Sequence, residues 1–95
     1  MIPTFQFDIV TLNGTAYSGK VRSLRLPGKK GSFGVLANHA ALIGACTKGL
    51  VRITNEAGEL ALYQVGKGFF EVVKNKALLL SSSAESTTDK LESKS

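Results

Sequence analysis

Apolar and polar residues alternate with a period of two along most of this chain, and turn residues interrupt the alternation about every eight to twelve positions. Phe5, Phe7 and Ile9, for example, share one phase, with polar residues between them. A period of two sends successive side chains to opposite faces of a β-strand, whereas an amphipathic helix needs a period near 3.6. The pattern therefore predicts an all-β sandwich or barrel of short antiparallel strands.

Turn residues indicate where the strands end. Asn13-Gly14 is a strong hairpin signal, because both residues readily adopt positive φ. Pro27-Gly28 should end the next strand, since proline lacks the amide donor that a sheet requires. Within that strand Ser23 interrupts the alternation, which predicts a β-bulge.

Three later segments complete the predicted outline. Residues 28–34 contain three glycines and two lysines, which is typical of a surface loop. Residues 77–80 are wholly apolar, which suits a strand buried on both faces. Near residue 82 the composition changes to Ser, Thr, Lys, Glu and Asp, which bury too little apolar surface to offset the entropy of ordering. We therefore expect one domain over residues 1–82 and a polar, disordered tail over residues 83–95.

Composition excludes several classes of protein. A chain of 95 residues holds one hydrophobic core. A single cysteine excludes an internal disulfide and favours a reducing compartment such as the cytosol. No run approaches the roughly 20 apolar residues of a membrane-spanning helix, and the first residues lack the features of a secretory signal.

The positive charge is concentrated in the predicted domain, where ten Lys and Arg residues face four acids over residues 1–82. This net charge of +6 suggests an acidic protein surface, anionic lipid or nucleic acid as partner. A basic β-barrel that binds single-stranded nucleic acid is therefore an alternative function. It would require exposed aromatic residues on one sheet face, whereas Phe5 and Phe7 share the phase that should face the core.

Motifs for catalysis or cofactor binding are weak. Residues 14–21 have the glycine and lysine spacing of a phosphate-binding loop, but Val21 lacks the hydroxyl that would bind Mg²⁺, so a hairpin is the better interpretation. The glycines of residues 28–34 could cradle an anion with backbone amides, although no helix start follows them. His39 and Cys46 are the only histidine and cysteine, and a buried structural thiol is favoured over a catalytic pair. We expect no catalytic residue, no cofactor and no metal.

The ordered motifs together resemble the N-terminal domain of the F-type ATP synthase epsilon subunit, in register from about Phe5 to Glu85. They are Phe7-Asp8-Ile9-Val10-Thr11, Tyr17-Ser18-Gly19-Lys20-Val21, Leu26-Pro27-Gly28, Gly31-Ser32-Phe33-Gly34-Val35-Leu36, Asn38-His39-Ala40 and Gly66-Lys67-Gly68-Phe69-Phe70-Glu71-Val72. The resemblance implies a flattened β-sandwich of about ten antiparallel strands. It also implies a non-catalytic central-stalk subunit that links the c-ring to the gamma subunit and couples proton-driven rotation to ATP synthesis, with no nucleic acid or small-molecule substrate of its own.

The resemblance also assigns contact residues and a location. Lys29, Lys30, Gly31, Ser32, Phe33 and His39 correspond to a rim that meets the c-ring and lower gamma, and Leu42, Phe69 and Glu71 correspond to positions near gamma. Ordinary core packing is an equally good account of the second set. The implied location is peripheral, on the cytoplasmic face of a bacterial inner membrane, because no transit peptide precedes the start; a chloroplast thylakoid membrane is the alternative.

Four departures from the family pattern affect these expectations. Ser32 stands where many relatives carry an acid, Ala41 replaces a usual proline, and Lys67 replaces one glycine of a pair. Relatives commonly continue with a C-terminal helical hairpin that inhibits ATP hydrolysis. Since the sequence ends at Ser95, where that hairpin would begin, we expect no inhibition of this kind.

Overall fold

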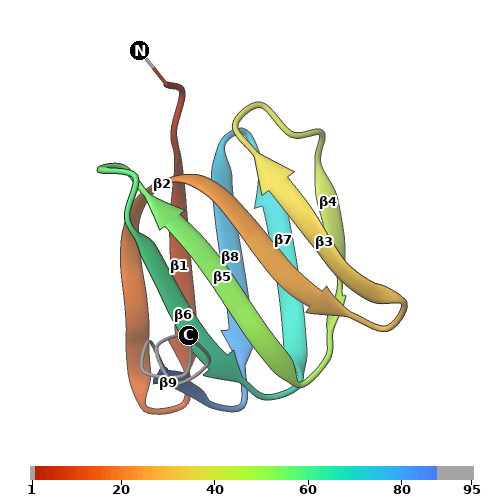
Figure 1. Ribbon diagram of the computed structural model, residues 1–95. Helices are drawn as coiled ribbons and strands as arrows, with labels where there is room; N and C mark the ends of the chain where they lie inside the picture. Colours follow the sequence, from red (N-terminus) through yellow and green to blue (C-terminus); the bar gives the residue numbers. More distant parts are fainter. Residues whose placement is uncertain (1, 88–95) are drawn as a thin grey trace.

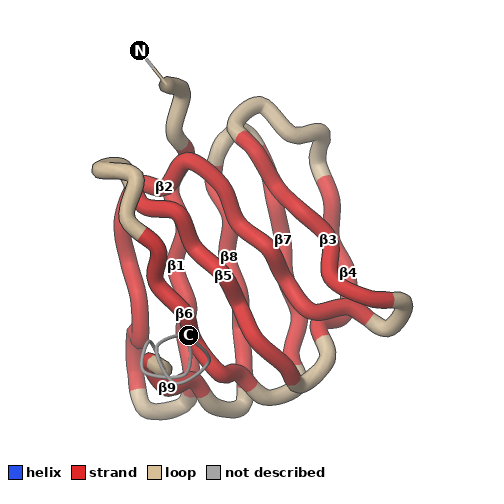
Figure 2. Tube along the Cα trace, viewed as in Figure 1, coloured by secondary structure: helices blue, strands red, loops and turns tan. Residues whose placement is uncertain are grey.

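The computed structural model describes residues 2–87, and all the regular structure in that range is β-strand (Figure 2). The strands are β1 (Phe5–Thr11), β2 (Gly14–Gly28), β3 (Gly31–Leu36), β4 (Leu42–Cys46), β5 (Gly49–Asn55), β6 (Leu60–Val65), β7 (Gly68–Val73), β8 (Lys76–Ser81) and β9 (Ala84–Ser86). The all-β class predicted from the alternation is confirmed. The described residues form nine strands, against the expectation of about ten.

The strands lie in two facing layers (Figure 1). Their hydrogen-bonded order is β4-β7-β8-β1-β2-β5-β6-β9, and β3 also pairs with β2. With 15 residues, β2 belongs to both layers, because its first half pairs with β1 and its second half pairs with β3 and β5. The register shifts between Val21 and Ser23, where β2 passes from one layer to the other. The bulge predicted at Ser23 is thus confirmed, and a bulge at this point helps the strand to bend.

One strand pair differs from the expected antiparallel arrangement. Residues 6–10 of β1 pair in parallel with residues 76–80 of β8. Parallel neighbours need a long connection between them, and here β2 to β7 supply it. The expectation that all strands are antiparallel is therefore corrected at the centre of one layer.

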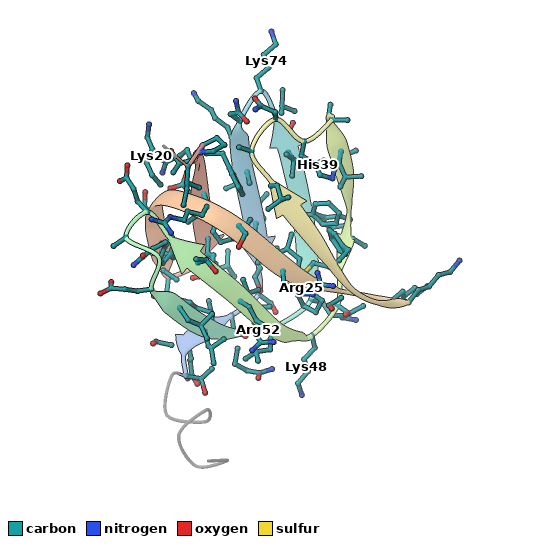
Figure 3. All side chains as sticks on the ribbon, turned by 45° about the horizontal axis from the view of Figure 1, so that its top comes forward. Lys20, Arg25, His39, Lys48, Arg52 and Lys74 are labelled. Atoms are coloured by element: carbon teal, nitrogen blue, oxygen red, sulfur yellow. The ribbon has the colours of Figure 1, made fainter. Side chains whose placement is uncertain are left out.

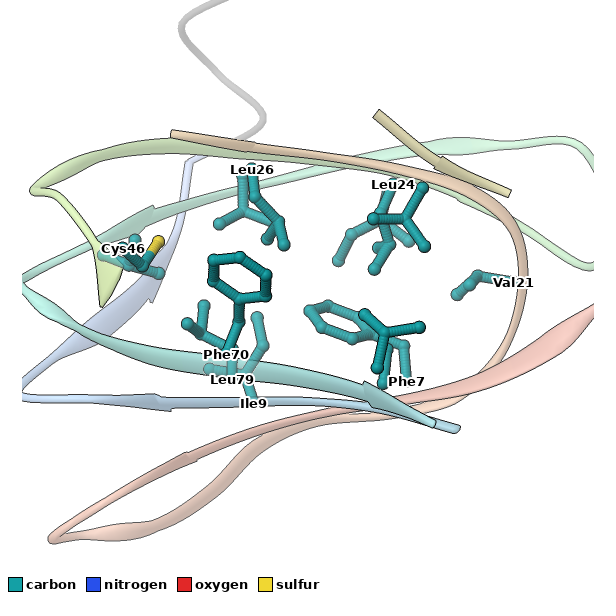
Figure 4. Close-up of a cluster of buried hydrophobic side chains, with 14 of the residues drawn as sticks. Phe7, Ile9, Val21, Leu24, Leu26, Cys46, Phe70 and Leu79 are labelled. Carbon is teal, nitrogen blue, oxygen red and sulfur yellow. The ribbon is translucent and has the colours of Figure 1, made fainter. Parts of the chain in front are cut away.

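The core lies between the two layers (Figure 4). Phe7, Ile9 and Leu79 from one layer have no exposed surface, and Leu24 and Leu26 face them from the other. Each of these side chains occupies the apolar phase of its strand, as the sequence pattern predicts. Close packing of this kind makes a protein interior stiff.

Residues 28–34 are not the predicted loop. β2 continues to Gly28 and β3 begins at Gly31, so that only Lys29 and Lys30 connect the two strands. Gly31 has a φ of 113°, a value that closes such a turn without a side-chain clash. The glycines mark a tight hairpin, because Gly28 and Gly31 pair directly across the ladder.

Two further predictions were wrong in their details. β8 is not buried on both faces, since Leu80 is 49% exposed; the second layer covers only the face that carries Ala77 and Leu79. The sheet also continues beyond residue 82, because β9 pairs with β6 and Ala84 packs against the core. The rest of the predicted tail, residues 88–95, lies outside the described residues.

Candidate functional site

The β2–β3 turn projects from one side of the sandwich (Figure 1). Its residues Lys29, Lys30, Gly31 and Ser32 are all exposed, and we call them the turn surface. Phe33 belongs to the same predicted contact set but points inward, and its ring centroid lies 4.8 Å from that of Phe70. The hairpin is therefore anchored by an aromatic pair, while its tip offers two positive charges to solvent.

His39 lies at the other end of β3 from the turn surface (Figures 1 and 3). About 13 Å of strand separates Ser32 from Leu36, at roughly 3.3 Å per residue, and His39 follows in the β3–β4 loop. His39 is half-buried as a residue, and its ring Nδ1 lies 2.7 Å from the carbonyl oxygen of Ala40. The structure thus does not bring the turn surface and His39 together into one rim.

Two asparagines join the His39 loop to the β7–β8 turn. The backbone N–H of Asn38 donates to Oδ1 of Asn75 at 2.6 Å, and Nδ2 of Asn75 donates to Oδ1 of Asn38 at 3.1 Å. Both residues have positive φ, 66° and 63° respectively, which asparagine tolerates better than most residues. This reciprocal pair fixes the position of the loop that carries His39.

Replacing Asn75 with glycine is expected to loosen this loop while leaving the turn conformation accessible. The variant loses both side-chain hydrogen bonds, at about 1 kcal/mol each, and amide exchange at Asn38 should accelerate. Native-state hydrogen exchange measures this. Asn13→Gly in the β1–β2 turn is the matched control, and equal acceleration at Asn38 in both variants would show that the pair does not hold the loop.

An exposed apolar surface covers the outer side of the layer that holds β4, β7, β8 and β1. Ile43 is 74% exposed and Phe69 is 64% exposed. Phe69 pairs with Leu80, which in turn pairs with Val10, so that apolar side chains continue across neighbouring strands. Together with the half-buried Leu78, these residues form what we call the outer apolar face. A contiguous exposed apolar patch is typical of a protein interaction site.

The sequence-predicted gamma contacts divide between the two sides of this layer. Phe69 and Glu71 are exposed on the outer side, and Glu71 pairs with Ile43. Leu42 has the opposite phase and packs against the core. Sequence reasoning missed Ile43 and Leu80. Their phase, opposite to that of the buried Cys46 and Leu79, is the signal that identifies them.

The groups considered for catalysis are not assembled into a site. Cys46 is buried at the end of β4 remote from the His39 loop, and its Sγ donates to the carbonyl oxygen of Pro27 at 3.2 Å. Residues 14–21 belong to strand β2, so they do not supply a phosphate-binding loop followed by a helix. Within residues 2–87 no group of three His, Cys, Asp or Glu side chains is placed to hold a metal ion. No helix in that range is long and apolar enough to cross a membrane.

Burial raises the pKa of the Cys46 thiol, so stability is expected to fall as the pH rises above the ordinary thiol value of about 8.5. In the unfolded chain the thiol ionises near that value, whereas in the folded chain it ionises only at higher pH. Its contribution is therefore complete below the unfolded pKa and is lost as the pH rises toward the folded one. Urea unfolding at several values between neutral and mildly alkaline pH measures how steeply the free energy of unfolding falls with pH. Cys46→Ala should flatten this slope, and an unchanged slope would contradict the assignment.

Comparison with known proteins assigns the fold to a family. The family model described as "ATP synthase, Delta/Epsilon chain, beta-sandwich domain" matches residues 4–87. The chain belongs to this ATP synthase delta/epsilon family. The resemblance inferred from the sequence motifs is confirmed, and the matches give no support to the nucleic-acid alternative.

Two curated relatives show how far the similarity extends. The chain is 42% identical over 76 residues to the ATP synthase epsilon chain of Chlorobaculum tepidum, covering 80% of this chain and 86% of that protein. It is 37% identical over 78 residues to the ATP synthase epsilon chain of Campylobacter jejuni (strain RM1221), covering 82% of this chain but 60% of that protein. It therefore spans less than two thirds of the length of the second relative.

Two solved assemblies contain chains of the same fold. A chain of the Euglena gracilis mitochondrial ATP synthase, in a structure of OSCP, F1 and c-ring, superposes with a TM-score of 0.83 and 19% identity, covering 99% of this chain and 63% of that one. A chain from the central stalk and c-ring structure of the Tetrahymena thermophila mitochondrial ATP synthase gives a TM-score of 0.68 and 12% identity, covering 84% and 64%. At these identities the likeness shows a shared fold.

Proposed function

We propose that this chain is the epsilon subunit of an F-type ATP synthase, a non-catalytic part of the central stalk. In this role it links the c-ring to the gamma subunit and transmits proton-driven rotation toward ATP synthesis. The match of the delta/epsilon family model to residues 4–87 carries the proposal, and relatives named ATP synthase epsilon chain support it. The chain would use no cofactor or substrate of its own. It would lie at the cytoplasmic face of a bacterial inner membrane, with a thylakoid membrane as the alternative.

The two exposed surfaces suit two different partners. The outer apolar face, which includes Ile43, Phe69 and Leu80, would pack against gamma, because apolar area removed from water stabilises a lasting interface. The turn surface, with Lys29 and Lys30 at its tip, would meet polar loops of the c-ring, where positive charge favours carboxylates or headgroups. His39, at the opposite end of β3, would then contact lower gamma rather than the same part of the ring.

A stiff body is what such a link requires. Torque passes from one partner to the other without loss only if the two contact surfaces keep their relative positions. The core between the layers is closely packed around Phe7, Ile9 and Leu79, and the two surfaces are parts of one hydrogen-bonded sheet system. Sandwich rigidity therefore supports a coupling role without any catalytic group.

Co-purification from detergent-extracted membranes that contain the complete ATP synthase tests the proposal. The tagged chain should recover both gamma and the c-ring. Reversing two charges of the turn surface, in Lys29→Glu/Lys30→Glu, should lower recovery of the c-ring about threefold, since exposed ion pairs are individually weak. Gamma should still be recovered through the outer apolar face.

The matched control reverses two exposed lysines elsewhere, in Lys20→Glu/Lys74→Glu (Figure 3). This variant should recover both partners as well as the wild-type chain does. If the wild-type chain recovers neither gamma nor the c-ring, the proposed function is wrong. If both double variants lose the c-ring equally, the turn surface is not the contact.

A further inference from the structure

A hollow of about 510 Å³ lies on the outer side of the other layer, where β2, β3, β5 and β6 line it. Two rows of paired residues cross its floor. One row runs Leu36, Ser23, Thr54, Leu60, and the other runs Gly34, Arg25, Arg52. Apart from His39 at its margin, the hollow shares no residue with the surfaces assigned above.

The second row places two guanidinium-bearing side chains beside each other. Arg25 and Arg52 are directly paired across β2 and β5, and both are exposed (Figure 3). Like charges directly opposite each other destabilise a sheet. None of the carboxylates in the described part of the chain lines the hollow to offset them; these are Asp8, Glu56, Glu59, Glu71 and Glu85. The hollow therefore carries two positive charges that suit an anion from outside.

The residue beside Arg25 leaves room for its guanidinium. Gly34 pairs with Arg25 across β3 and β2, and a Cβ at Gly34 would lie 3.0 Å from Nη1 of Arg25. The φ of Gly34 is not positive, so that its backbone conformation does not itself demand glycine. What glycine supplies here is space for the guanidinium.

The remaining lining indicates which kind of anion fits. Leu36 and Leu60 are exposed at the two ends of the first row, with Ser23 and Thr54 between them. Among residues 2–87, no phenylalanine or tyrosine lines the hollow as a platform on which a nucleotide base would stack, and the His39 ring lies only at its margin. Two guanidinium groups with leucines nearby suit a ligand whose carboxylates are flanked by apolar side chains.

We propose that this hollow binds an acidic segment of a partner protein, in which two carboxylates are flanked by leucine-like side chains. Each guanidinium can hold a carboxylate through two parallel hydrogen bonds. The exposed leucines would cover the apolar neighbours of those carboxylates. The hollow lies on the layer opposite the outer apolar face, and among the residues proposed above to contact gamma it includes His39 alone.

The test uses the full chain and a short fluorescein-labelled peptide that alternates Leu and Glu. The same peptide with every Glu replaced by Gln is the ligand control. Fluorescence anisotropy should detect binding of the Glu peptide only, and amide chemical shifts of Gly34, Leu36 and Thr54 should move on titration. Inorganic phosphate and ATP form separate arms, and stronger shifts of these amides with either of them would overturn the proposal in favour of a phosphate site.

Three variants distinguish specific binding in the hollow from nonspecific attraction of the peptide to a positively charged protein. Arg25→Gln/Arg52→Gln should weaken binding about tenfold or more, as expected for the loss of charge-assisted hydrogen bonds. Gly34→Ala, which changes no charge, should weaken it a few fold by crowding Arg25. Lys20→Gln/Lys74→Gln removes the same charge as the double arginine variant and should leave binding within twofold. Equal weakening in the two double variants, or shifts confined to the outer apolar face, would overturn the proposal.

Discussion

Replacing Gly68 with alanine is expected to destabilise the domain by about 3 kcal/mol or more, at the upper end of the cost of overpacking. Gly68 opens β7 and pairs with Cys46 on one side and Ser81 on the other. A Cβ at this position would overlap the backbone carbonyl oxygen of Leu80. A backbone atom of a paired strand cannot rotate away as a side chain can, so the β7–β8 ladder would have to separate locally.

Gly19→Ala is the matched control for this substitution. Gly19 also lies within a strand, but the nearest atoms to an added Cβ belong to the Tyr17 side chain, at 3.7 Å. Alanine at Gly19 should therefore be neutral or slightly stabilising, because glycine is unfavourable in a strand. Urea unfolding followed by circular dichroism measures both variants. Equal midpoints would show that the β7–β8 ladder adjusts freely to the added methyl group.

Local signals in the sequence were sufficient for the strands and several turns. The alternation of Phe5, Phe7 and Ile9 predicted an inner face that the structure confirms. Ser23 predicted a bulge, and the register shift lies beside it. These predictions succeeded because period and turn chemistry depend on neighbouring residues and hardly on the rest of the fold.

Predictions that depend on which layer covers which face were less successful. The run 77–80 is apolar in both phases, and only the tertiary arrangement shows that one phase, with Leu80, lacks a covering layer. The parallel pairing of β1 with β8 joins segments separated by most of the chain, and no local pattern encodes it. The same applies to Arg25 and Arg52, which are unremarkable in sequence and become a pair only through the register of β2 and β5.

The candidate contacts show how a strand can separate residues that are near in sequence. The resemblance to the epsilon subunit assigns Ser32 and His39, which are seven positions apart, to one contact rim. In the structure β3 lies between them in extended form, so they lie near opposite ends of that strand. Had residues 28–34 formed the expected loop, Ser32 would not have been held in an extended strand that leads away from His39.

Truncating two phenylalanines, one on each side of the same layer, is expected to separate stability from partner binding. Phe7 has no exposed surface, and its ring lies 5.9 Å from that of Tyr17. Phe7→Ala should therefore cost about 3–5 kcal/mol, a large part of the 5–15 kcal/mol that stabilises a typical domain. Phe69 is 64% exposed, so Phe69→Ala should cost less than about 1 kcal/mol.

The Phe69 variant, which should be the more stable of the two, is nevertheless expected to bind gamma less well than the wild-type chain. Phe69→Ala removes a central side chain of the outer apolar face, and its folded population should recover less gamma than the wild-type chain does, because aromatic side chains often dominate an interface. Urea unfolding measures the stability of each variant, and co-purification from the same preparations measures how much gamma it recovers. A Phe69 variant that unfolds as readily as the Phe7 variant would place Phe69 in the core. A stable Phe69 variant with undiminished gamma would instead remove the outer apolar face from the proposed interface, because the loss of its largest exposed side chain would then have no effect on binding.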